Sequence, residues 1–274
     1  MTAKALFQPI KIGPYTLKHR LALAPLTRMR AEPTTLAVWQ LNADYYSQRT
    51  TDGGLMICEA SQVMQEGQGS PNTPGCFSPA QTEGWKIVTK AIHDKGGIAF
   101  LQLWHVGRAS HSSFQPGGAL PVSASPIAIK GKTRTADGKV AEFETPRARE
   151  TSDIPRVVEA YKQGALNAIA AGFDGVEIHG ANGYLIEQFM QSNSNQRTDA
   201  YGGSIENRCR LLKEVTEAVI SAIGAERTGV RLSPYGISND SGEADPMPLY
   251  TYAIKMLAEL KIAYLHFVEP RSSG

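Results

Sequence analysis

Three polar side chains that could act together on one small molecule lie within six positions of the sequence. His179, Asn182 and Tyr184 occur in EIHGANGYLIEQF, residues 177–189, directly after an apolar run and among glycines. An imidazole and a carboxamide can both donate a hydrogen bond to one oxygen, and a phenol stands just beyond them. These residue types at this spacing suit a site that polarises a neutral substrate.

Each of these residues also has an ordinary structural interpretation. A lone histidine at a strand end is usually a satisfied structural residue, and Asn182-Gly183 is a common turn signal. Tyr184, Leu185 and Phe189 can form one buried face of a helix. The residues alone leave both interpretations open, so the surrounding elements must decide between them.

Six short apolar runs recur along the chain, each bounded by Gly, Pro or polar residues. Near-continuous apolar runs are typical of strands buried on both faces, as in a parallel sheet. The runs are residues 20–26, 54–60, 97–104, 173–180, 228–234 and 263–269. Helical patterns separate them, at residues 78–97, 154–172 and 203–224. This strand–helix alternation predicts an α/β fold, a (β/α)8 TIM barrel rather than an open doubly wound sheet.

Two segments lie outside the alternation. Residues 1–19 predict an N-terminal hairpin that turns at Gly13, and we expect it to act as a lid on the barrel floor. Residues 105–150 form a long connection after the third strand, with a second hairpin predicted at TADGKV. Because so long a loop in a compact domain usually serves function, we expect it to cap the C-terminal mouth of the barrel.

Composition and cysteine usage exclude several classes of protein. The 274 residues are 42% hydrophobic and 20% charged, which predicts a soluble globular protein. The net charge of +2 comes with no basic stripe or long apolar segment, so we expect no nucleic-acid or membrane partner. Cys58, Cys76 and Cys209 are odd in number and widely spaced, which argues against disulfides, a metal site or an iron–sulfur cluster. With no secretory signal pattern, the chain is expected to be cytoplasmic.

In a barrel, side chains at the carboxyl ends of the strands face one mouth. That mouth offers amide, hydroxyl, imidazole, phenol and guanidinium groups, without an HExxH, GxSxG or Walker signature. Such a set suits a polar planar cofactor and a neutral substrate. The candidate residues are Pro25, Leu26, Thr27, Ala60, Gln102, Trp104, His179, Asn182, Tyr184 and Arg231.

Four longer strings resemble the old yellow enzyme family of FMN-dependent ene-reductases. They are APLTRMR (24–30), QLWHVGRASHSSFQPGG (102–118), VEIHGANGYLIEQFM (176–190) and SNQRTDAYGGSIENR (194–208). The strings occur in the family's order along essentially the whole chain. The resemblance implies an eight-stranded barrel with an N-terminal hairpin lid, FMN at the C-terminal mouth, and NADPH or NADH as reductant.

The resemblance also implies which residues would bind FMN. Pro25, Leu26 and Thr27 would line the flavin. Ala60 and Gln102 would bond its pyrimidine edge. The resemblance places Arg231 beside N1 and O2, where a fixed cation stabilises the negative charge of a reduced flavin.

For the substrate, the resemblance implies an α,β-unsaturated carbonyl or nitro compound whose C=C bond is reduced. His179 and Asn182 would donate to its oxygen while hydride arrives from flavin N5. Tyr184 would deliver the proton to the α-carbon, and Trp104 with Thr27 would shape the substrate pocket. In this scheme NAD(P)H reduces the flavin first and then leaves the same site.

The number of strands conflicts with a closed barrel, which needs eight. Residues 1–274 supply six, so we expect an incomplete TIM-barrel domain with open edges at the first and sixth strands, through which it could self-associate. This expectation leaves alternatives to an active enzyme: a truncated member that lacks the FMN phosphate site and is inactive alone, or one that needs a complementary chain. A barrel enzyme without flavin is disfavoured, because no strand-end lysine or carboxylate base accompanies His179.

Overall fold

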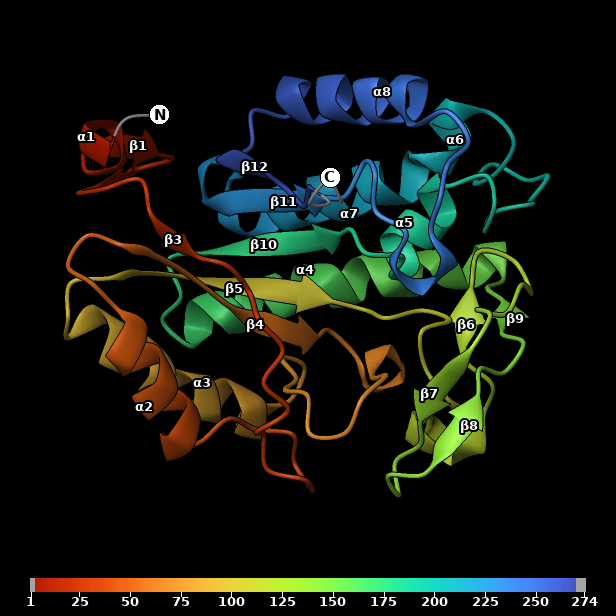
Figure 1. The fold of residues 1–274 in the computed structure, drawn as a ribbon, viewed down its shortest axis with the longest axis horizontal. Coiled ribbons are helices and arrows are strands. Elements are labelled where there is room, and N and C mark those ends of the chain that lie inside the picture. The colour runs from red at the N-terminus through yellow and green to blue at the C-terminus, as the bar shows by residue number, and fades with distance from the viewer. Residues whose placement is uncertain (1–2, 270–274) are drawn as a thin grey trace.

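Six parallel strands form the central sheet of the computed structural model, which describes residues 3–269 (Figure 1). Their order across the sheet is β12-β11-β10-β5-β4-β3, so neighbours in the sheet are successive predicted strands in the chain. Every predicted strand is confirmed, although some are shorter than their apolar runs. The strands are β3 (Ala22–Leu23), β4 (Leu55–Gln62), β5 (Ile98–Trp104), β10 (Gly175–Gly180), β11 (Thr228–Leu232) and β12 (Tyr264–Phe267).

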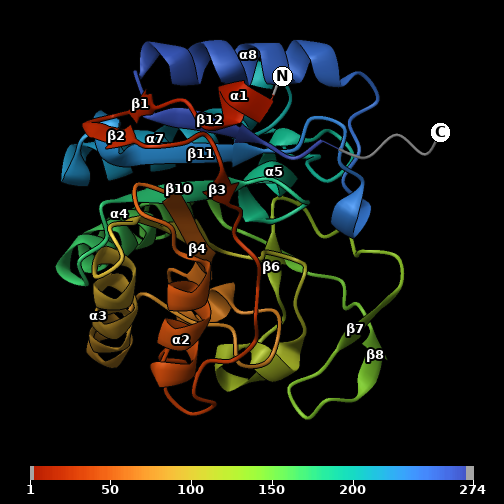
Figure 2. The same ribbon diagram turned by 60° about the vertical axis from the view of Figure 1, so that its left-hand side comes forward.

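Helices connect the strands and cover the outer face of the sheet (Figures 1 and 2). The three predicted helices are confirmed as α3 (Pro79–His93), α4 (Ile154–Ala170) and α7 (Arg210–Ile223). Helix α3 begins at a capping residue, because the Ser78 hydroxyl accepts from the backbone N–H of Gln81. The other helices are α1 (Ala3–Leu6), α2 (Gln40–Arg49), α5 (Leu185–Met190), α6 (Ile205–Arg208) and α8 (Pro246–Glu259).

Single-turn 3-10 helices lie in the connections between these elements. They span Gln65–Gly67, Ser112–Phe114, Pro116–Gly118, Thr151–Asp153, Ala225–Arg227 and Ser238–Asp240. Within residues 3–269, no helix is long and apolar enough to cross a membrane.

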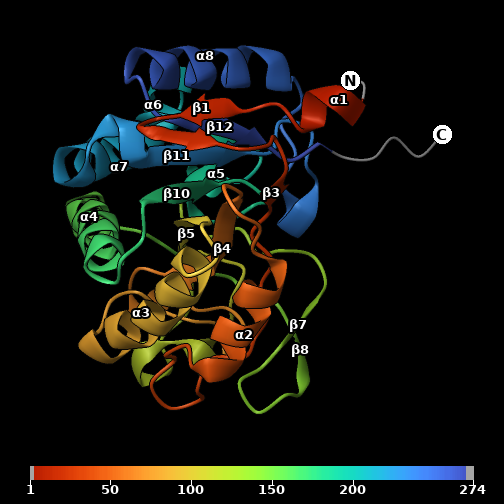
Figure 3. The ribbon, with the colours of Figure 1, turned by 90° about the vertical axis from the view of Figure 1, so that its left-hand side faces the viewer.

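The N-terminal hairpin consists of β1 (Ile10–Ile12) and β2 (Tyr15–Leu17), which pair across the predicted turn. Figure 3 looks onto the amino ends of the sheet strands and shows this hairpin in front of them. The Tyr15 hydroxyl donates to the carbonyl of Asp174, directly before β10, at 2.9 Å. Gly13 lies against Glu226, two residues before β11. The hairpin therefore covers the floor of the sheet, opposite the predicted mouth.

The long connection after β5 lies beyond the carboxyl ends of the strands (Figure 1). It contains the predicted hairpin, formed by β7 (Lys132–Arg134) and β8 (Val140–Glu142). Two further short strands, β6 (Val122–Ser123) and β9 (Arg147–Ala148), pair in parallel. The buried guanidinium of Arg149 bridges Glu66 and Asp153 and so ties the returning end of the connection to the rest of the protein.

Docking of the floor hairpin predicts a difference between two glycine substitutions. Gly13 and Gly138 both have positive φ (+53° and +83°), so alanine strains either position. At Gly13, however, a Cβ would lie 1.9 Å from the carbonyl oxygen of Glu226, whereas at Gly138 nothing lies within 4 Å. Gly138→Ala should lower the melting temperature by roughly 2–4 °C, and Gly13→Ala by at least twice as much. Equal losses in a thermal denaturation experiment would contradict this docking.

Candidate active site

The parallel register brings the candidate residues of three neighbouring strands to one mouth. His179 on β10 is paired with Arg231 on β11, and Gln102 on β5 is paired with Glu177, two positions before His179. Trp104 ends β5 and belongs to a buried cluster with Ala60 of β4, against which Tyr184 packs. Residues far apart in the sequence therefore meet, as expected from a barrel.

The candidates after β3 lie on a loop beside this mouth. Pro25 is buried, whereas Thr27 and Leu26, which is 52% exposed, are open to solvent. The next backbone N–H, that of Arg28, donates to Glu59 at 2.9 Å. Glu59 directly precedes Ala60, so this bond ties the loop to the carboxyl end of β4.

Three aromatic rings hold one another in a fixed arrangement at the mouth. The Tyr184 ring stands edge-on to both His179 and Trp104, with ring centroids 5.0 and 4.9 Å apart. The His179 and Trp104 rings are nearly parallel, with centroids 6.3 Å apart. Packing on these sides limits rotation of the imidazole and of the phenol.

His179 is a neutral hydrogen-bond donor in this environment. The backbone N–H of Ala181 donates to its Nδ1 at 3.3 Å, so the single proton of a neutral ring must lie on Nε2. Burial holds the pKa of His179 well below its usual value, and the positive charges of Arg231 and His266 lower it further. The ring therefore keeps one donor, on Nε2, at neutral pH.

The turn that carries Asn182 is held by its backbone. Asn182 has φ +57°, a left-handed conformation that asparagine tolerates better than most residues. Its N–H donates to the Ser233 hydroxyl at 2.7 Å, and its carbonyl accepts from the Asn239 amide at 2.9 Å. Because these bonds use only the backbone of Asn182, its side-chain amide is not needed to form the turn.

Tyr184 is placed as a protonated phenol. Burial raises its pKa above the usual value, while the neighbouring Asn239 amide and the charge of Arg231 act in the opposite direction. The raised pKa means that the hydroxyl keeps its proton through neutral and mildly basic pH. A phenol of this kind can act as a general acid.

Gln102 is bonded to a buried carboxylate, whereas Arg231 has no ion-pair partner among the described residues. The Gln102 amide nitrogen donates to Glu177 at 2.7 Å, and His266 Nδ1 lies 2.9 Å from the other carboxylate oxygen. The Nε of Arg231 is buried without a hydrogen-bond partner among the described residues, and no described carboxylate oxygen lies within 4.0 Å of its guanidinium. The mouth therefore contains a cation without a direct ion pair among the described residues, although the charge of Glu177 acts on it from a greater distance.

Sequence reasoning gave no role to the buried carboxylates that support this site, Glu59 and Glu187. Glu59 directly precedes Ala60, and Glu187 follows Tyr184 by three positions. Each lies in an otherwise apolar stretch, and an ionisable residue in such a stretch was the available signal. Ser233, which accepts from the turn at Asn182, was also missed. It lies in the predicted fifth strand run, but nothing in the sequence indicates its partner.

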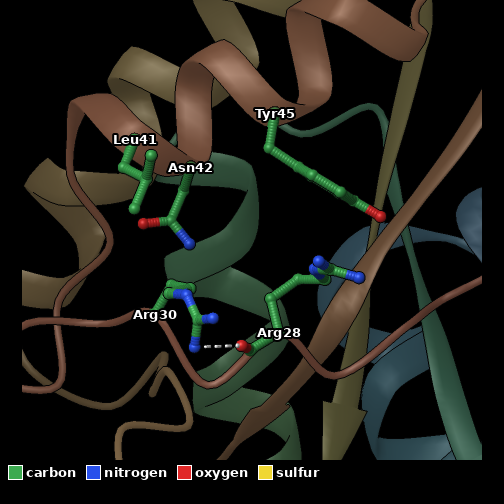
Figure 4. Close-up of a pocket in the computed structure, with 5 residues that line it drawn as sticks. All are labelled: Arg28, Arg30, Leu41, Asn42 and Tyr45. Carbon is green, nitrogen blue, oxygen red and sulfur yellow. Dashed lines mark hydrogen bonds between the residues drawn. The ribbon is translucent and has the colours of Figure 1, made fainter.

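A small cavity lies beside the loop that follows β3 (Figure 4). It has a volume of about 110 Å³ and is lined by Arg28, Arg30, Leu41, Asn42 and Tyr45. The Arg28 guanidinium lies 4.6 Å from the centre of the Tyr45 ring, and Arg30 donates to the Arg28 carbonyl at 3.3 Å. None of the predicted site residues lines this cavity, so it is separate from the proposed reaction site.

The burial of Glu59 predicts a dependence of stability on pH. Burial raises the pKa of Glu59 from 4.5 to about 7, with hydrogen bonds from Arg28, Asn42 and Tyr46 acting in the opposite direction. The folded protein therefore binds this proton more tightly than the unfolded chain, and the contribution of Glu59 to stability falls as pH rises from about 5 to 8.

Glu59→Gln should remove this contribution to the pH dependence. At about 1.4 kcal/mol per pH unit, the unfolding free energies of variant and wild type should diverge by up to about 3 kcal/mol between pH 5 and 8. Urea unfolding at several pH values measures the difference in unfolding free energy between the two proteins. The contributions of the other titrating groups are the same in both and cancel in this difference. Parallel curves for the two proteins would contradict the raised pKa.

Comparison with known proteins agrees with the arrangement of the strands. The family model of the NADH:flavin oxidoreductase / NADH oxidase family matches residues 5–274. The chain is 48% identical to 12-oxophytodienoate reductase 7 of Oryza sativa subsp. japonica, over 97% of this chain and 69% of that protein. It is 47% identical to flavin oxidoreductase hxnT of Emericella nidulans, over 97% of this chain and 70% of that protein.

Solved structures of similar proteins extend the match to the fold. The old yellow enzyme homologue from Zymomonas mobilis has a TM-score of 0.94 and 45% identity, covering 98% of this chain and 75% of that chain. Morphinone reductase in complex with tetrahydroNAD has a TM-score of 0.91 and 43% identity, covering 96% and 73%. The curled parallel sheet is therefore part of a TIM barrel of this kind, to which the described residues contribute six strands.

Proposed function

Because the chain belongs to the NADH:flavin oxidoreductase / NADH oxidase family, we propose that it reduces the activated C=C bond of α,β-unsaturated carbonyl or nitro compounds. This is the old yellow enzyme family that the sequence resembles, and the chain is an NAD(P)H-dependent flavin oxidoreductase with FMN as its cofactor. One observation carries the choice of substrate class. It is the neutral His179 ring, with its proton on Nε2, beside the protonated phenol of Tyr184. The centroids of the two rings are 5.0 Å apart.

The residues at the mouth fit bound FMN. The guanidinium of Arg231, which has no direct ion pair among the described residues, suits the flavin N1 and O2 edge, which gains negative charge on reduction. The NH₂ of Gln102 is engaged by Glu177, so its amide oxygen is the group left to accept a hydrogen bond from the pyrimidine edge, next to Ala60. The open residues after β3, Leu26 and Thr27, offer an apolar contact and a hydroxyl, with Pro25 buried behind them. Bound FMN would supply hydride to the β-carbon of the alkene.

His179 and Asn182 would polarise the substrate. The Nε2–H of His179 and the side-chain amide of Asn182 donate to the carbonyl or nitro oxygen, on which negative charge develops as the β-carbon accepts hydride. Donors fixed before the reaction stabilise that charge without reorganising, and they do so more strongly in a buried site than in water. Because His179 is already neutral, this donor does not change with pH in the neutral range.

Tyr184 would then complete the reduction. Its hydroxyl transfers a proton to the α-carbon, so that hydride and proton together saturate the C=C bond, and solvent restores the phenol proton. The raised pKa of Tyr184 keeps this proton available. Trp104 packs against both catalytic rings and, with Thr27, would bound the substrate pocket.

Replacing both oxygen-binding donors tests substrate polarisation. His179→Ala with Asn182→Ala should lower kcat/KM for cyclohexenone at least 100-fold, because each fixed donor stabilises the developing charge. The FMN content, measured by visible absorbance, should stay the same. His19→Ala, at the floor of the sheet, is the control for loss of a histidine.

Two outcomes would contradict the proposal in different ways. Unchanged turnover by the double variant would remove the proposed roles of His179 and Asn182. Colourless wild-type protein that takes up no added FMN would contradict the activity of this chain as a flavoenzyme.

Tyr184→Phe separates proton delivery from reduction of the flavin. The variant should reduce cyclohexenone at least about 100-fold more slowly, since it lacks the acid. Its rate of FMN reduction by NADPH, measured by stopped-flow absorbance, should stay within about twofold of wild type, because that half-reaction needs no proton from Tyr184. Equal slowing of both half-reactions would rule out the proposed acid.

A further inference from the structure

A carboxylate lies fully buried behind the turn that carries Asn182 and Tyr184. It belongs to Glu187, in the middle of the short helix α5, whose residues are all buried. The polar groups that face the carboxylate are the backbone N–H of Gly183, the hydroxyls of Ser233 and Tyr250, and the amide of Gln191. None of these groups carries a charge at neutral pH, so the carboxylate is held by neutral donors and not by an ion pair.

In each of its direct hydrogen bonds the Glu187 carboxylate is the acceptor. The Ser233 and Tyr250 hydroxyls donate to Oε1 at 2.7 and 2.5 Å, and Gly183 N–H donates to Oε2. Each hydroxyl also accepts a bond from elsewhere, Ser233 from Asn182 N–H and Tyr250 from the Gln191 amide. Each hydroxyl proton is therefore free to point at Glu187. These donors favour the ionised carboxylate and act against burial, which raises the pKa of Glu187 above its usual value.

These bonds secure two successive residues in the left-handed conformation. Asn182 has φ +57° and Gly183 has φ +73°. Glu187 binds Gly183 N–H directly and Asn182 N–H through Ser233. On the carbonyl side, the Gln188 amide donates to Gly183 at 2.8 Å. A left-handed conformation is strained for a residue other than glycine, so it persists only where such contacts oppose the strain.

The turn sets the directions of two proposed catalytic side chains. Asn182 lies in it, and Tyr184 follows it directly and precedes the first residue of α5. The hydrogen bonds that hold the turn use neither the Asn182 side-chain amide nor the Tyr184 hydroxyl. A change of φ at Gly183 would turn Asn182 and Tyr184 relative to each other, and so disturb their arrangement around His179, which is held separately by β10 and Ala181.

We propose that Glu187 is a positioning residue for the reaction, and that it acts by holding the Asn182–Gly183 turn through Gly183 N–H and the Ser233 hydroxyl. Glu187 makes no hydrogen bond to the Asn182 side-chain amide or to the Tyr184 hydroxyl. Its effect on the reaction passes through the backbone of the turn. The inference rests on the proposed ene-reductase function, since it concerns the aim of the donor and the acid in that reaction.

Glu187→Gln is the principal test. A glutamine keeps the shape of the side chain, but either Gly183 N–H or the two hydroxyls must then face an N–H donor instead of an acceptor. We expect at least a tenfold fall in kcat for cyclohexenone, with FMN content unchanged. Independently of activity, amide hydrogen exchange in a peptide spanning residues 181–185 should become at least tenfold faster.

Two further variants keep the test decisive if Glu187→Gln folds poorly. Ser233→Ala retains the carboxylate and removes only the link to Asn182, so KM for cyclohexenone should rise more than kcat falls. Tyr15→Phe removes a single hydrogen bond at the floor of the sheet and serves as a control for lost stability remote from the mouth. It should leave both kcat and exchange in residues 181–185 unchanged.

The outcomes separate this inference from the proposed function. Glu187→Gln and Ser233→Ala proteins that retain wild-type kcat, KM and exchange in residues 181–185 would overturn the positioning role, while leaving ene-reduction in place. A loss of melting temperature without those changes would show that Glu187 only stabilises the fold, and would also overturn it. Wild-type protein that binds FMN but reduces no enone would contradict the proposed function, and the exchange measurement would still test whether Glu187 holds the turn.

Discussion

The hydrogen bond from Ala181 N–H to His179 Nδ1 is the interaction on which the chemistry at the mouth depends. It commits the neutral imidazole to a proton on Nε2, and burial together with Arg231 and His266 keeps the ring from gaining a second one. A histidine with the opposite tautomer would present a lone pair to a substrate oxygen and repel it. The bond is local, but the strand register fixes the ring beside Arg231, and the aromatic neighbours fix its plane.

Buried carboxylates form a second layer behind the mouth. Glu59 accepts from the loop after β3, Glu177 accepts from Gln102, and Glu187 accepts from the turn at Gly183. Each carboxylate orients a group that is proposed to face the flavin or the substrate. Negative charge at the mouth itself would oppose the charge that develops on an enolate oxygen or a reduced flavin, whereas carboxylates engaged with donors behind it add rigidity. Arg231, beside His179 in the sheet, is left without a carboxylate within 4.0 Å among the described residues.

The sequence predicted those parts of the fold that depend on local patterns. Buried apolar runs marked all six strands, and the turn residues marked both hairpins. Two helices lacked a clear signal: α2 is mostly polar and buries Asn42, and α8 begins with two prolines within three residues. The partners of the buried carboxylates could not be predicted, because Glu187 meets Tyr250 across 63 positions of sequence. The motif strings identified the family and the candidate site residues, whose individual roles stay proposals.

The tautomer and charge of His179 are the most direct test of this account. Nitrogen-15 NMR of the protein with labelled histidine reports the protonation of each ring nitrogen separately, and a His179→Ala sample assigns the signals. We predict a neutral ring with its proton on Nε2 across pH 6–9, both with and without added FMN. A ring protonated on Nδ1, or an imidazolium at neutral pH, would contradict the assignment of His179 as a neutral donor to the substrate oxygen.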